Sequence, residues 1–141
     1  MPYMESSNDV IIYAEMHLVF DNDFDVNEIT RLIKIEPSEC KCRWETRISP
    51  LTNKQNEGFW TLKSKEKSEW DLKIILEDLL IMFKHKLKEI KDICDEQNGS
   101  VIFDIIPSFT PENKPALYFE RDFLDIVDYL NATIQIDMYV L

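Results

Sequence analysis

The sequence predicts an α+β domain in which a largely antiparallel sheet of about five strands packs on one face against three helices, one of them long. Two observations lead to this fold class. Segments with a two-residue apolar period and segments with a helical period follow one another in the order β-α-β-α-β-β-α-β. The length of 141 residues is typical of one domain, and no repeat or boundary divides the sequence. We therefore predict a single domain over residues 1–141, with residues 1–8 flexible.

The first half of the chain is predicted to contain two strands, a short helix and a long loop. Apolar residues occupy the even positions between residues 10 and 20, which is the period of a half-buried strand. Asp25 and Glu28 have the spacing of a capping box and begin the short helix, which a proline ends. Residues 36–58 show no sustained period and are predicted to be a long loop, of a length that is often functional. The second strand follows at residues 59–63.

A long helix is the central element of the second half. Ser68 and Asp71 are its predicted cap, and Asn98-Gly99 suits a left-handed cap after about Gln97. At ~1.5 Å per residue this helix would be roughly 43 Å long and would cross the whole domain. Its apolar stripe consists of Leu72, Ile75, Leu76, Leu79, Phe83, Leu87, Ile90 and Cys94.

Shorter elements complete the chain. A strand over residues 101–106 is predicted to end at Pro107, and a short strand is expected at residues 116–119. A helix over about residues 122–130 comes next. The last strand alternates through residues 133–140 and has a predicted core face made of Ile134, Ile136, Met138 and Val140.

Charge is distributed unevenly along the chain. The net charge is −11, with seven acids and no Lys or Arg in residues 1–30, whereas residues 31–67 are basic. A surface that is acidic overall repels nucleic-acid phosphates and anionic lipid heads, so we expect neither nucleic acid nor membrane as a partner. The longest apolar runs are far shorter than the roughly 20 residues of a bilayer span, and the N-terminus is acidic where a signal peptide is basic. A cytoplasmic protein with a basic protein partner is the simplest expectation.

The cysteines and histidines do not form a recognisable metal or catalytic motif. Cys40 and Cys42 are too close for an ordinary disulfide, and with Cys94 they make an odd count, so reduced thiols are expected. A structural zinc site needs four ligands, and only His17 and His85 could join the cysteines, from separate elements. Both histidines are predicted to be surface residues, His17 on the wet face of the first strand. We therefore predict no catalytic residues, no metal and no cofactor, and interpret the chain as a protein that is not an enzyme.

One cluster in the long loop has the composition of a binding site. Arg43, Trp44 and Arg47 combine an aromatic ring with two guanidinium groups, residue types that are enriched at binding hot spots. The alternative is that Trp44 packs down over the sheet as an anchor for the loop. Trp60 is expected to fill the core instead.

Exposed acids form the second set of candidate partner-binding residues. Asp21 and Asp23 precede the short helix and are not needed to cap it, and Asp125 and Asp128 lie on the predicted wet face of the last helix. Such acids can steer a basic partner by their long-range field. The alternative is that they serve only solubility.

Three short motifs are spread over the chain: Asp-Phe-Asp-Val-Asn-Glu-Ile-Thr at residues 23–30, Ile-Glu-Pro at 35–37 and Gly-Phe-Trp-Thr-Leu at 58–62. With these motifs and its C-terminal half up to the last strand, the chain resembles the bacterial family known as domain of unknown function 4279. It covers nearly the whole chain, but its motifs are structural, so it implies the fold more than a function. Related chains tend to carry a glycine in the loop after the proline, and residues 38–44 lack one.

Two functional hypotheses follow. In the first, the chain is an acidic immunity protein that neutralises a basic toxin domain by direct binding, because it resembles such proteins in size and acidity. In the second, it is a small-ligand or regulatory domain whose 36–58 loop folds over the sheet and binds an anion through Arg43 and Arg47. The sequence leaves the oligomeric state open.

Overall fold

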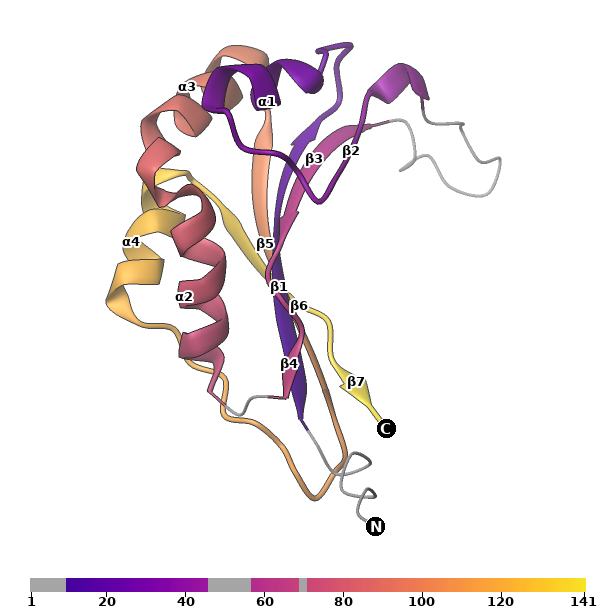
Figure 1. The fold of residues 1–141 in the computed structure, drawn as a ribbon, viewed down its shortest axis with the longest axis vertical. Helices are drawn as coiled ribbons and strands as arrows, with labels where there is room; N and C mark the ends of the chain where they lie inside the picture. Colours follow the sequence, from indigo (N-terminus) through magenta and orange to yellow (C-terminus); the bar gives the residue numbers. More distant parts are fainter. Residues whose placement is uncertain (1–9, 46–56, 69–70) are drawn as a thin grey trace.

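The computed structural model describes residues 10–45, 57–68 and 71–141. The predicted flexibility of residues 1–8 and the predicted binding residue Arg47 fall outside these ranges. The fold is α+β, as predicted: one mixed sheet, with the helices gathered on one of its sides (Figure 1). The strands are β1 (Ile11–Phe20), β2 (Glu39–Lys41), β3 (Gly58–Lys63), β4 (Lys67–Ser68), β5 (Ser100–Phe109), β6 (Thr133–Ile136) and β7 (Tyr139–Val140). The helices are α1 (Asn27–Ile33), α2 (Leu72–Phe83), α3 (Leu87–Gln97) and α4 (Arg121–Tyr129).

The long strands β1 and β5 form the centre of the sheet. The strand order is β2-β3-β1-β5-β6, with β4 paired to β1 and β7 paired to β5. β1 is antiparallel to both β3 and β5, whereas β5 is parallel to β6 and β7. The sheet is therefore largely antiparallel, with a parallel part at the side where the chain ends.

The core lies between the sheet and the helices. The even positions of β1 are fully buried, as their alternation predicts, and the neighbouring strand β3 adds Trp60 and Leu62, both 0 % exposed. The Trp60 ring also donates a 2.9 Å hydrogen bond from Nε1 to Oγ1 of Thr30 in α1. The odd positions of β1 point to the other side of the sheet, which we call the open face because none of the helices above packs on it.

The long helix is confirmed, and it contains a break. The Asp71 carboxylate accepts a 3.0 Å hydrogen bond from the Lys73 backbone N–H at its start, and Asn98 ends it with a left-handed φ of 56°. Between α2 and α3 residues 84–86 form a 3₁₀ turn, and the axis bends there (Figure 1). Both halves keep an apolar side in the core, since Ile75, Leu76 and Leu79 of α2 and Ile90, Ile93 and Cys94 of α3 are buried. The prediction that Ser68 takes part in the cap is wrong, because Ser68 pairs with β1 as part of β4.

Three predicted boundaries are corrected by sheet pairing. The 36–58 segment contains β2, an edge strand too short to show a period, which pairs with β3. β5 continues through Pro107, where its ladder to β6 has ended and its ladder to β7 has not begun, so the missing N–H costs no sheet bond. The expected strand at 116–119 is reduced to one bridge between Asp71 and Ala116.

The terminal strand also differs from its prediction. It is divided into β6 and β7, and its proposed core face is largely exposed: Ile136 is 39 % exposed, Met138 58 % and Val140 61 %. Figure 1 shows the reason, since β7 leaves the region that the helices cover. Alternation therefore indicated the strand conformation correctly but not the burial of its apolar face.

Candidate functional site

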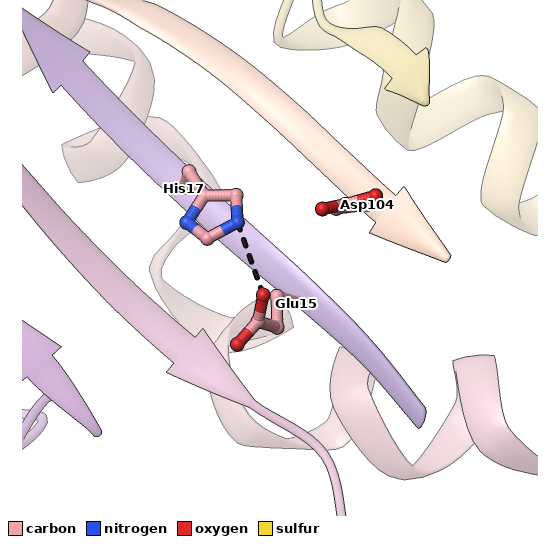
Figure 2. Close-up of side chains that lie close together, drawn as sticks. All are labelled: Glu15, His17 and Asp104. Atoms are coloured by element: carbon pink, nitrogen blue, oxygen red, sulfur yellow. Dashed lines mark ion pairs between the residues drawn. The ribbon is translucent and has the colours of Figure 1, made fainter. Parts of the chain in front are cut away.

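A polar cluster lies on the open face, where the register of three strands brings it together. Glu15 and His17 are two residues apart on β1 and so point to the same side. The pairing of β1 with β5 places Asp104 directly opposite Glu15, and its pairing with β3 places Thr61 opposite His17. Figure 2 shows the Asp104 carboxylate on the neighbouring strand beside the other two side chains.

The side-chain atoms of this cluster contact one another or lie only a little farther apart. His17 Nε2 is 3.2 Å from Glu15 Oε1, and His17 Nδ1 is 2.8 Å from Thr61 Oγ1. One ligand atom each from Glu15, His17 and Asp104 lies within 4.8 Å of the others. The Glu15 and His17 side chains are about one quarter exposed, whereas Thr61 is buried. The imidazole is therefore held between a hydroxyl group on one side and two carboxylates on the other.

Asp104 is the least satisfied member of the cluster. It is 8 % exposed, and its Oδ1 is a buried side-chain oxygen without a hydrogen-bond partner in the described ranges. Burial, a hydrogen bond to Asp137 and the charges of Asp137 and Glu15 together raise the pKa of Asp104 to about 7, with burial as the largest cause. A carboxylate at this place would be stabilised by a proton or by a cation.

The predicted residues of the loop and of the acidic turn come together in a second place. Arg43 Nη1 donates a 2.6 Å hydrogen bond to the backbone oxygen of Asp21 and lies 3.9 Å from Asp23 Oδ1. Trp44 follows in a 3₁₀ turn and is 57 % exposed, so it does not pack down as a loop anchor. We call Asp21, Asp23, Arg43 and Trp44 the Trp44 surface.

The acids next to this surface have structural roles. Asp25 Oδ1 accepts a 3.0 Å hydrogen bond from the Asn27 backbone N–H, and this bond is the main reason why the pKa of Asp25 is lowered. The Cys42 thiol lies 3.4 Å from the same oxygen. Glu28 forms an ion pair with Arg31. The predicted capping box is therefore not formed: the N-cap of α1 is Val26, which makes no side-chain cap bond, Asp25 accepts from Asn27 instead of Glu28, and Glu28 pairs with Arg31.

Two of the predicted acids are separate from both places. Asp125 and Asp128 are exposed on α4, on the helical side of the sheet (Figure 1). Cys42 and Cys94 are buried, Cys40 is partly buried, and all three are thiols. Burial raises the pKa of Cys94 to about 12, which makes it a poor nucleophile.

The prediction of two surface histidines is half right. His85 is exposed, but His17 is partly buried and has a partner on each ring nitrogen. The open-face cluster was missed because strand partners cannot be read from one strand. Asp104 did leave a signal, since it is the charged residue in the otherwise uncharged segment 100–109. An acid inside an apolar strand is rarely buried without a partner.

A hollow of about 620 Å³ lies between α2 and α4, on the helical side and remote from the open face. Its walls carry both signs of charge, with Lys73, Lys84 and Arg121 beside Glu77, Glu120 and Asp122. Among the described residues, its lining includes no histidine or cysteine, and its three basic side chains are balanced by three acidic ones. The hollow is therefore a weaker candidate for chemistry than the cluster around Asp104.

Comparisons with known proteins give a family and no function. No curated protein and no solved structure matches the chain significantly. In the ranges that the structure describes, no helix combines the length and the apolar character needed to cross a membrane. The family described as "Domain of unknown function (DUF4279)" matches residues 12–141, which is nearly the whole chain. The chain belongs to this DUF4279 family.

Proposed function

We propose that this chain is a cytoplasmic, non-enzymatic binding protein of the immunity type, which neutralises a basic toxin domain through the Trp44 surface. The observation that carries the proposal is the contact of Arg43 with Asp21 and Asp23. It joins the exposed tryptophan and the acidic turn, about 20 residues apart in the sequence, into one surface.

The composition of this surface favours protein recognition. Trp44 leaves more than half of its side chain in solvent, although a tryptophan gains more from burial than most residues. Tryptophan and arginine are enriched among the residues that carry most of the energy of an interface. A partner that covers Trp44 would bury a large apolar area beside a fixed guanidinium group.

The charges favour a basic partner. The Asp23 side chain is 81 % exposed, and Asp21 is exposed beside it, on a protein whose net charge is −11. A field of this sign speeds the encounter with a positively charged domain and slows the encounter with anions. We expect Asp21 and Asp23 to act at the interface, and Asp125 and Asp128 to contribute at long range.

The Arg43 contact is expected to fix the conformation of the Trp44 surface more than it stabilises the fold. Exposed ion pairs contribute little to folding, but a side chain held in place loses less entropy when a partner binds. The same contact disfavours the alternative hypothesis of an anionic ligand bound by Arg43 and Arg47. The Arg43 guanidinium already faces a carbonyl oxygen and a carboxylate, which would repel an anion.

The test uses the polypeptide encoded directly upstream of this chain. We expect its variable C-terminal domain to stop growth of a bacterial host, and co-expression of this chain to restore growth. Trp44→Ala should weaken the complex at least ~100-fold, the loss typical of a hot-spot residue. Reversal of Asp21 and Asp23 to Lys should slow association and imitate added salt.

A matched control separates local contact from overall charge. Reversal of Asp125 and Asp128 to Lys changes the net charge by the same amount, but on α4 and not at the Trp44 surface. It should slow association less than reversal at Asp21 and Asp23. An upstream product without toxicity, or binding that is indifferent to Trp44, to salt and to both reversals, would contradict the proposal.

A further inference from the structure

We propose that Glu15, His17 and Asp104 on the open face form a binding site for a divalent transition-metal ion of the Zn²⁺ class. The three side chains come from adjacent positions of β1 and β5, and their ligand atoms lie within 4.8 Å of one another. The site shares no residue with the Trp44 surface. The two proposals can therefore fail independently.

The donor set fits this class of metal. One imidazole nitrogen with two carboxylate oxygens is a ligand set that Zn²⁺ accepts, with ligand distances of about 2.0 to 2.2 Å. Mg²⁺ and Ca²⁺ prefer oxygen ligands alone, so the histidine selects against them. Three protein ligands leave a fourth position for water, and the partial exposure of Glu15 and His17 gives access to it.

The neighbours of His17 prepare it as a ligand. Thr61 is buried, and its Oγ1 lies 2.8 Å from Nδ1. When Nδ1–H donates to this oxygen, the lone pair of Nε2 is directed at Glu15, 3.2 Å away. Two lone pairs at this distance need a positive centre, which is either a proton on Nε2 or a metal ion beside both atoms. A metal ion can take this place without a change of strand register.

Asp104 supplies the independent indication of a ligand. Its Oδ1 is a buried atom without a hydrogen-bond partner among the described residues, in a residue that is 8 % exposed, and one oxygen of the same carboxyl group belongs to the atoms grouped around His17. A buried polar atom without a partner is costly, so a native structure that keeps one usually has an ion or water for it. The side chain also has a hydrogen bond to Asp137, which requires a proton between the two carboxyl groups. With that proton on Asp137, its O–H would donate to the Asp104 carboxylate and orient it as an outer partner.

The ligand atoms need only small movements to close around an ion. A tetrahedral site with these bond lengths separates its ligand atoms by ~3.3 Å. His17 and Glu15 already have this separation. Rotation of the Asp104 carboxylate about its side-chain bonds would bring it nearer, while the three backbone segments stay in the sheet.

The experiment uses the full chain, without an affinity tag and after treatment with a chelator. Zn²⁺ is titrated by calorimetry, and Co²⁺ by its visible absorption, which reports the ligand geometry. We expect one ion per chain, a shift of the His17 Nε2 resonance in the nitrogen spectrum, and a higher melting temperature with Zn²⁺. Excess Mg²⁺ or Ca²⁺ should not displace the bound ion.

Variants locate the site. Glu15→Gln, His17→Gln and Asp104→Asn should each weaken Zn²⁺ binding by more than ~100-fold, since loss of an outer partner alone costs about 10- to 100-fold. Thr61→Val, which keeps the shape but removes the hydroxyl group, should weaken binding about tenfold and keep the stoichiometry. Circular dichroism of the metal-free variants checks folding, and Glu15→Gln removes the charge of a partly exposed residue with almost no change of shape.

Two controls test other sources of metal affinity. His85→Gln removes the exposed histidine, and Cys40→Ser removes a partly buried thiol next to Cys42. Both should leave Zn²⁺ affinity within about twofold of the parent protein. The proposal is overturned if the parent protein binds Zn²⁺ no more tightly than a variant with all three ligands replaced. It is also overturned if the binding is lost with Cys40 or His85 and kept in Asp104→Asn.

Discussion

The two faces of β1 present opposite chemistry from one backbone. Toward the helices, Met16 and Leu18 are completely buried in an apolar core, whereas toward the open face Glu15 and His17 keep about a quarter of their side chains in solvent. The first face has no charged group, and its energy comes from burial and packing. The second has an imidazole, three nearby acids and a buried oxygen that has no hydrogen-bond partner within residues 10–45, 57–68 and 71–141. We infer that the covered face stabilises the fold and that the open face is adapted to binding.

The largest effect is expected on the covered face of β3. Trp60→Ala should lower the free energy of unfolding by about 3 to 5 kcal/mol, because it leaves a cavity and removes the hydrogen bond to Thr30. Phe59→Ala on the opposite face of the same strand is the matched control, and it should cost clearly less. Denaturant unfolding measures both. Equal costs would contradict the division into a stabilising and a binding face.

The next effect is expected where the long helix returns to the sheet. A Cβ atom at Gly99 would lie 2.3 Å from Phe20 Cε2, and this ring is fully buried. Gly99→Ala should therefore cost roughly 1 to 3 kcal/mol through overpacking. The left-handed conformation belongs to Asn98, so Gly99 is needed for space and not for its φ angle. Asn98→Ala tests the left-handed position separately, and a neutral Gly99→Ala would show that Phe20 can move.

On the open face a substitution should stabilise the metal-free protein. Below pH ~4 the Asp104 carboxyl is protonated in both states, and between pH ~4 and about 7 the unfolded chain loses this proton while the folded chain keeps it. Stability therefore falls as the pH rises through this window. Asp104→Asn should flatten the fall and raise stability at pH 7 by on the order of 1 kcal/mol. Thermal melting from pH 4 to pH 8 measures this, with the exposed Asp125→Asn as control. If the Asp104→Asn variant were less stable than the parent protein at pH 7, the claim that burial destabilises the ionised Asp104 carboxylate would be wrong.

The smallest effect on stability is expected at the Trp44 surface. Trp44→Ala should change the free energy of unfolding by less than about 1 kcal/mol, because the ring is mostly in solvent. The same variant should lose partner affinity if the proposed function is correct. Melting and titration of one preparation give both values. If stability and affinity fell together, Trp44 would be a packing residue like those of the covered face.

Local patterns predicted the elements that depend on one segment at a time. The alternation of β1 and the stripe of the long helix each follow from the period of a single backbone conformation, and the structure confirms both. The end of that helix at Asn98 was also predictable, because left-handed backbone has a short-range preference. Predictions that required a partner strand were less successful, as β2, Pro107 and the exposed end at β7 show.

The sequence by itself determined that Glu15 and His17 share a face of one strand, that Trp60 faces the core, and that Asp21 and Asp23 are not needed as caps. Only the tertiary structure decided that Asp104 stands opposite Glu15, Thr61 opposite His17, and Arg43 against the acidic turn. The physical reason is register. The face of a side chain depends on its own strand, but its neighbour depends on which residue of another strand is paired with it.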